Sequence, residues 1–145
     1  MLTLHHRRRH IDHKLELLRD LPAFRSLEAD QLLRVGSLVE LVDVPAGTVL
    51  TRAGDRAREA YLIVEGHLRV VRGSLTVTTL GPGAFAGEVA LLDGRPRATG
   101  LEAATDVRLC VVDRAGVVRL IDDSPSPVGH LLEQLAVRVR EGVPT

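Results

Sequence analysis

The chain has 145 residues, with 19 basic and 19 acidic side chains and a single cysteine. This length fits one domain whose core needs no disulfides, and the balanced charge excludes a global field that would draw the protein to nucleic acid or to an acidic membrane. No apolar run reaches the length of a membrane span and the N-terminus lacks a secretory signal, so we expect a cytoplasmic protein. We interpret Cys110, which lies in an apolar run, as a core residue.

The N-terminal residues are strongly basic, with the sequence HHRRRH at positions 5–10. We interpret residues 1–10 as a disordered, solvated tail, and docking of this tail to an acidic partner or to nucleic acid is the alternative. The folded domain is expected over residues 11–145. It begins with two short packing helices, one with Ile11, Leu15 and Leu18 on a single face and one from Glu28 to Val35.

From Leu38 onward, short β-rich runs alternate with turns built from Gly, Pro, Asp and Ser. The runs cover residues 38–44, 48–52, 60–64, 67–72, 75–80, 99–103 and 107–112. In the hairpin of residues 67–80, the apolar residues Leu68, Val70, Leu75 and Val77 alternate with polar ones, so one face can be buried. Many short strands at this spacing predict a mainly β fold, an antiparallel jelly-roll-like β-barrel.

Helices are predicted again after the strands, so helices flank the barrel at both ends of the chain. Asp113 is a suitable N-cap for a helix that carries Val117, Val118 and Ile121. Ser126 and Pro127 then provide the cap and first residue of a final helix. The apolar stripe of that final helix consists of Val128, Leu131, Leu132, Leu135 and Val139.

The segment from Gly87 to Thr99 has the sequence GEVALLDGRPRAT, and its residue types suit a phosphorylated sugar. Gly87 lets the backbone approach a ligand closely, and the first amide hydrogens of a helical turn after it are free to bind an anion. Arg97 offers a planar fork of donors for phosphate oxygens, and Glu88 offers a carboxylate that accepts hydrogen bonds from vicinal hydroxyls. A cation for phosphate and an acceptor for ribose predict a nucleotide ligand.

Four stretches occur in an order that resembles the cyclic nucleotide-binding domain. This domain is shared by catabolite-activator-type regulators, protein kinase regulatory subunits and cyclic-nucleotide-gated channels. The stretches are PAGTVLTRAGD at residues 45–55, YLIVEG at 61–66, GAFAGEVALL at 83–92 and PRAT at 96–99. The resemblance spans about residues 21–141, and it is most specific where it includes Glu88 and Arg97.

This resemblance implies that residues 87–92 form a phosphate-binding cassette. The backbone amides and the ribose-binding carboxylate of the cassette would come from Gly87, Glu88, Val89 and Ala90. Arg97 would neutralise the cyclic phosphate. The Ala98 amide would complete the anion site, and Thr99 could add its hydroxyl.

The resemblance also places parts of this chain near the base of the nucleotide. Val70 and Val77 occupy the matching strand positions, and a lid would come from the last helix, where Leu135, Arg138 and Val139 are the candidates. Ala98 stands where members that favour cGMP often have a threonine or serine. The chain therefore favours cAMP as its ligand, with cGMP as the second choice.

The expected activity is binding without chemistry. Occupancy of the phosphate site would move the C-terminal helices, so the chain would act as a regulatory sensor module. We expect a protein effector that contacts the C-terminal helix, and both a monomer and a homodimer fit the sequence. No DNA-binding module is expected, because the chain ends at Thr145 after the last helix.

Two other functions are compatible with this pattern. Glu88 and Arg97 could form an internal salt bridge in a ligand-free interaction module that retains the fold, although such a pair repays its desolvation poorly. A metal-dependent barrel enzyme is the weaker alternative, because His67 has no second ligand within two residues. We therefore predict no metal site, no catalytic residue and no cofactor other than the ligand itself.

Overall fold

The computed structural model describes residues 14–21, 24–25, 27–87, 90–91 and 94–122, with side chains described as far as residue 119. The predictions for the basic tail, for the final helix and for the lid candidates Leu135, Arg138 and Val139 lie outside these residues. Among the described residues, no helix combines the length and apolar character needed to cross a membrane.

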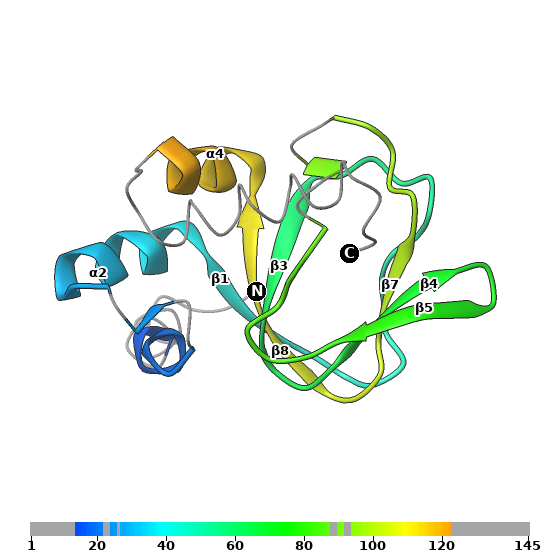
Figure 1. Cartoon of the computed structure of the whole chain (residues 1–145), viewed down its shortest axis with the longest axis horizontal. Coiled ribbons are helices and arrows are strands. Elements are labelled where there is room, and N and C mark those ends of the chain that lie inside the picture. Colours follow the sequence, from blue (N-terminus) through cyan, green and yellow to red (C-terminus); the bar gives the residue numbers. More distant parts are fainter. Residues whose placement is uncertain (1–13, 22–23, 26, 88–89, 92–93, 123–145) are drawn as a thin grey trace, which may run out of the picture.

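Two antiparallel four-stranded sheets form the centre of the molecule. The first sheet has the strand order β1-β8-β3-β6 and the second β2-β7-β4-β5. The strands are β1 (Glu40–Val44), β2 (Val49–Thr51), β3 (Glu59–Glu65), β4 (Leu68–Arg72), β5 (Leu75–Leu80), β6 (Phe85–Ala86), β7 (Gly100–Ala103) and β8 (Val107–Asp113). Figure 1 shows the second sheet on one side of the first and the helices on the other.

The central strand β3 is apolar on both faces because each face is covered. Ala60, Leu62 and Val64 belong to the core cluster shared with the helices, whereas Tyr61 and Ile63 belong to the cluster between the two sheets. Successive side chains of a strand point to opposite faces, so an unbroken apolar run fits a strand between two cores. This alternation turns Tyr61 toward the space between the sheets.

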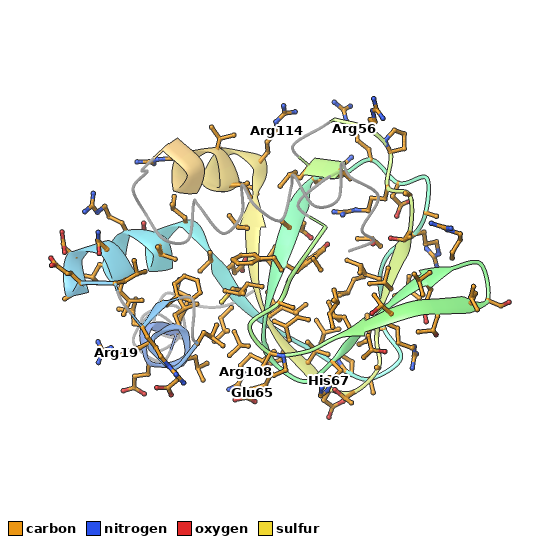
Figure 2. All side chains as sticks on the ribbon, viewed as in Figure 1. Arg19, Arg56, Glu65, His67, Arg108 and Arg114 are labelled. Carbon is orange, nitrogen blue, oxygen red and sulfur yellow. The ribbon has the colours of Figure 1, made fainter. Side chains whose placement is uncertain are left out.

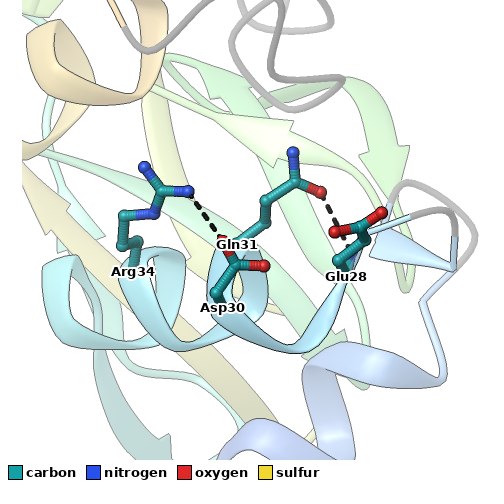
Figure 3. Close-up of polar contacts among 4 residues, drawn as sticks. All are labelled: Glu28, Asp30, Gln31 and Arg34. Carbon is teal, nitrogen blue, oxygen red and sulfur yellow. Dashed lines mark hydrogen bonds and ion pairs between the residues drawn. The ribbon is translucent and has the colours of Figure 1, made fainter.

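Helices close the open face of the first sheet. Residues 14–19 are helical, α2 covers Ala29–Leu38 and α4 covers Arg114–Asp122. At the start of α2 the Glu28 amide donates to Gln31 Oε1 at 2.9 Å, and one turn along Arg34 pairs with Asp30 at 3.2 Å (Figure 3). Because the Asp30–Arg34 pair is exposed, the buried face of α2 matters more for its stability than this surface pair.

Two buried polar groups lie within the core beside the helices. Lys14 Nζ donates to the Val39 carbonyl at 2.8 Å, which ties the N-terminal helix to the end of α2, and burial lowers the pKa of this ammonium. Cys110 is fully buried, and burial raises the pKa of its thiol to about 12. The thiol is therefore protonated at neutral pH, as expected for the core residue predicted from sequence.

The predicted fold class is confirmed as mainly antiparallel β and jelly-roll-like, with two facing sheets rather than one closed barrel. Each predicted β-rich run contains a strand, and the ends differ by at most two residues. The sequence missed β6, because a two-residue strand has no periodicity to detect. Phe24, Tyr61 and Phe85 are buried.

The predicted N-cap of the helix after the strands is confirmed. Asp113 ends β8, and its Oδ1 accepts a hydrogen bond from the Gly116 amide at 2.7 Å. Asp113→Ala should lower the free energy of unfolding by about 1 kcal/mol, the typical value of an N-cap, as measured by chemical denaturation. Asp113→Asn keeps an acceptor and serves as the control. An equal loss in both variants would contradict this account of the cap.

Candidate functional site

The backbone of Arg97 is paired with the loop that connects β2 to β3. The Arg97 amide donates to the Asp55 carbonyl at 2.9 Å, and the Gly54 amide donates to the Arg97 carbonyl at 2.7 Å. The loop is itself closed by a hydrogen bond of 2.8 Å from the Arg52 amide to Asp55 Oδ2. These hydrogen bonds hold the backbone of Arg97 in place, although the residue lies outside any helix or strand.

The guanidinium of Arg97 lies inside the molecule, and the residue is 6% exposed. Its Nη2 donates to the Glu59 carbonyl at 2.6 Å and its Nη1 donates to the Gly87 carbonyl at 3.2 Å. The Cζ atom lies 5.9 Å from the centroid of the Tyr61 ring. Within the described part of the chain, no carboxylate forms an ion pair with this guanidinium. Its positive charge is therefore held by neutral carbonyls and a ring face.

Gly87 adopts a backbone conformation with φ of +80°, in the region that favours glycine. A Cβ atom at this position would lie 2.5 Å from Arg97 Nη1 and 3.3 Å from Arg97 Cζ. The absence of a side chain therefore lets the guanidinium reach the backbone at the start of the predicted cassette.

Arg97 lines a pocket of about 330 Å³ at one end of the sheets. The other lining residues are Leu50, Thr51, Asp55, Arg56, Arg58, Glu59 and Tyr61. Figure 2 shows Arg56 at this end of the molecule and Glu65, His67 and Arg108 at the opposite end. With three arginines against two carboxylates, the pocket has an excess of positive charge that suits an anion.

Thr51 contributes a buried hydroxyl to the same pocket. The residue is 8% exposed, and its Oγ1 has no hydrogen-bond partner among the described residues. Thr51 is paired with Leu101 in the neighbouring strand, and Leu101 is buried between the sheets. Since buried polar groups nearly always have partners in folded proteins, this hydroxyl is a candidate ligand contact.

The structure brings two of the predicted site residues together, since Arg97 contacts Gly87 directly. Val70 and Val77 pack into the core between the sheets, the first of them fully buried, and neither lines the Arg97 pocket. Ala98 is exposed and Thr99 half-buried, directly after Arg97.

The cassette after Gly87 is described only in part. Ala90 lies in a helical turn, and Glu88 and Val89 lie outside the described residues. The predicted meeting of the Glu88 carboxylate with Arg97 therefore stays a prediction.

Sequence reasoning missed Thr51, Glu59 and Tyr61 as residues of the site. No residue pattern marks a backbone acceptor such as the Glu59 carbonyl. The signal that existed was the β3 alternation, since Tyr61 shares a strand face with Glu59.

A second pocket, of about 410 Å³, lies at the opposite end. It is lined by Asp43, Val44, Pro45, Glu65, Asp106, Val107 and Arg108. Arg108 pairs with Asp43 at 2.8 Å and with Glu65 at 3.8 Å, and Asp106 accepts a hydrogen bond from the Ala46 amide at 2.9 Å, so the three carboxylates give this pocket an excess of negative charge. Among the described residues, no three His, Cys, Asp or Glu side chains are grouped as metal ligands.

The unpaired hydroxyl of Thr51 leads to a stability prediction. Thr51→Val should raise the free energy of unfolding of the ligand-free protein by about 1 kcal/mol, because it replaces a buried polar group without a partner by a methyl group of similar size. Chemical denaturation measures the change. Thr105→Val is the matched control and should destabilise, since the Thr105 hydroxyl accepts from the His67 amide and donates to the Asp106 carbonyl. A loss of stability in Thr51→Val would contradict the assignment.

Comparison with known proteins identifies relatives of this chain. It is 34% identical to a cyclic nucleotide-gated potassium channel of Mesorhizobium japonicum, over 86% of this chain and 34% of the channel. It is 27% identical to a CRP-like cAMP-activated global transcriptional regulator of Mycobacterium tuberculosis, over 86% of this chain and 58% of the regulator. The chain therefore spans only part of these relatives, about a third of the channel.

A solved structure from a cyclic-GMP-dependent signalling pathway that regulates bacterial phytopathogenesis shares the fold over nearly its whole length. Its TM-score is 0.66 at 30% identity, over 81% of this chain and 97% of that one. The family model described as the cyclic nucleotide-binding domain matches residues 41–124, which include all the strands but the first residue of β1 and the whole Arg97 pocket. The chain belongs to the cyclic nucleotide-binding domain family.

Proposed function

We propose that this domain binds cAMP in preference to cGMP and acts as a regulatory sensor in the cytoplasm, by binding without chemistry. The observation that carries the proposal is the buried Arg97 guanidinium, held beside the Gly87 backbone by two hydrogen bonds to carbonyls and lining a positively charged pocket. An arginine already oriented in this way loses little conformational entropy when an anion binds. The cyclic phosphate would take the remaining donors of Arg97 and the amides of the segment 87–90.

The route from the phosphate site to the helices starts at Gly87. Four residues later, Leu91 is 2% exposed and belongs to the core cluster that contains Phe24, Leu32 and Val117. A ligand that draws residues 87–90 toward Arg97 would shift Leu91 in the packing between the first sheet and the helices. For such a ligand to act as a switch, it must bind the two states with different affinity, and a hundredfold difference corresponds to about 2.7 kcal/mol. We infer that an effector protein contacts the C-terminal helix and reads this shift.

The preference for cAMP rests on Ala98. Its side chain is exposed and has no hydroxyl with which to select guanine. Thr99 follows Ala98 directly and Thr51 has a hydroxyl in the Arg97 pocket, so the affinities for both cyclic nucleotides must be measured. Isothermal titration of the wild-type protein with cAMP and cGMP tests the proposal, and tighter binding of cGMP would reverse the preference.

A ligand-free interaction module is the alternative function. It is favoured by the hydrogen bonds that Arg97 already makes with the Glu59 and Gly87 carbonyls. Thermal unfolding separates the two functions, because a ligand at about a hundred times its dissociation constant adds roughly 2.7 kcal/mol of stability. No shift with either cyclic nucleotide would favour the interaction module.

Arg97→Ala should remove most of the affinity for cAMP. Charge-assisted hydrogen bonds contribute about 1.5–3 kcal/mol each, so the loss of a single contact lowers affinity by about tenfold or more. Titration calorimetry measures the loss, and thermal unfolding checks that the variant is folded. Arg69→Ala is the matched control, because Arg69 lies on β4 and pairs with Glu102 outside the Arg97 pocket. Equal affinity of Arg97→Ala and the wild type would remove Arg97 from the site.

Gly87→Ala should weaken cAMP binding by displacing the guanidinium. The new methyl carbon would clash with Arg97 Nη1, and the backbone at φ of +80° disfavours any side chain. We expect a loss of affinity together with a loss of about 1 kcal/mol of stability. Gly83→Ala is the control, since it has a φ of +88° and nothing within 4 Å of its Cβ position. If both variants lose the same affinity, the contact with Arg97 is not the cause.

A further inference from the structure

The hydroxyl of Tyr61 forms a hydrogen bond for which the proposed function gives no role. Tyr61 is 3% exposed, and its hydroxyl donates a hydrogen bond to Glu59 Oε1 at 3.0 Å. The two residues are separated by one position on β3, so their side chains lie on the same face of the strand. Both line the pocket that contains Arg97.

The Glu59 residue is close to Arg97 but does not form an ion pair with it. Arg97 Nη2 donates to the backbone carbonyl of Glu59 at 2.6 Å, whereas the carboxylate of the same residue accepts from Tyr61. In the described part of the molecule, each ion pair joins residues other than these two. The Glu59 carboxylate therefore binds Tyr61, although the backbone carbonyl of the same residue binds Arg97.

A carboxylate free to reach Arg97 would compete with an anionic ligand. Carboxylate and phosphate both match the donor fork of a guanidinium, so a phosphate would have to displace any carboxylate paired with it. In a partly buried pocket such a pair is screened less than at the surface. A contact that keeps such a carboxylate from pairing with Arg97 thus raises the affinity for the anionic ligand.

We propose that Tyr61 is a positioning residue of the anion site: its hydroxyl holds the Glu59 carboxylate away from Arg97, so that the guanidinium stays available to a phosphate-bearing ligand. This inference rests on the proposed function. The ring of Tyr61 contributes separately, because its face lies 5.9 Å from Arg97 Cζ and supports the cation there.

The hydroxyl is a donor throughout the physiological pH range. Burial and the neighbouring Glu59 carboxylate raise the pKa of Tyr61 well above its ordinary value of 10.0, and only the charge of Arg97 opposes this shift. The tyrosine therefore remains protonated and able to donate to Glu59.

The test compares Tyr61→Phe, Glu59→Gln and the double variant by calorimetric titration with cAMP. Tyr61→Phe keeps the ring but releases the carboxylate, and we expect affinity to fall by about tenfold, the size of one charge-assisted contact. Glu59→Gln removes the competing charge and is the reference for the double variant. The double variant should bind within about threefold of Glu59→Gln, because a neutral amide does not form an ion pair with Arg97 whether or not the Tyr61 hydroxyl is present.

The recovery separates positioning from packing. If Tyr61 acts only by packing, the double variant stays as weak as Tyr61→Phe, and this result overturns the inference. Unchanged affinity in Tyr61→Phe overturns it as well. Thermal unfolding confirms that each variant is folded. If the phenylalanine variant does not fold, Tyr61→Met replaces it; because methionine also removes the ring, its affinity is then compared only with that of Tyr61→Met combined with Glu59→Gln, and equal affinities overturn the inference.

A separate measurement keeps this inference distinct from the proposed function. If the wild type binds neither cAMP nor cGMP, the proposed function fails. The inference about Tyr61 is then tested on the ligand-free protein, by the signals of the Arg97 guanidinium in nuclear magnetic resonance spectra. Arg97→Lys assigns those signals. We expect Tyr61→Phe to change their shifts and the hindered rotation of the guanidinium, and the double variant to restore both. Identical spectra in all variants overturn the inference.

Discussion

The site depends on the hydrogen bonds between one guanidinium and two backbone carbonyls. Arg97 joins the first residue of β3 to the residue that follows β6, and its own backbone is bonded to the loop between β2 and β3. A buried cation is costly unless its donors are satisfied, and the carbonyls satisfy part of them without neutralising the charge. The two carbonyls therefore reduce the cost of a positive charge inside the molecule, and that charge is what an anionic ligand would use.

The two-core architecture decides where this charge lies. Alternate residues of β3 enter different cores, so Tyr61 faces the second sheet while Ala60 and Leu62 face the helices. Two residues that line the Arg97 pocket, Leu50 and Tyr61, thus belong to the core between the sheets, whereas Leu91, four residues after Gly87, belongs to the core beside the helices. Under the proposed function, this short segment would couple ligand binding to the packing of the helices.

Pattern-based prediction was accurate where the information is local. The β-rich runs, the turns between them and the Asp113 cap each depend on neighbouring residues and agree with the structure. Arg97 was selected as a phosphate ligand from its chemistry and from a family resemblance, and the structure places it against Gly87. The contact between Glu59 and Arg97 could not be predicted, because the two residues are 38 positions apart in the sequence. The unpaired Thr51 hydroxyl could not be predicted either, because no sequence pattern shows that a buried group lacks a partner.

The sequence by itself determined the strand-rich centre, the helix capped by Asp113, the family and the residue types of the candidate anion site. It did so because periodicity, turn chemistry and short motifs are properties of adjacent residues. Only the tertiary structure decided that the strands form two facing sheets. It also decided that the buried Arg97 guanidinium donates to backbone carbonyls, with no ion pair to a described carboxylate, and that the Tyr61 hydroxyl donates to the Glu59 carboxylate. These features depend on which distant backbone segments meet, and packing between the sheets, rather than local preference, brings them together.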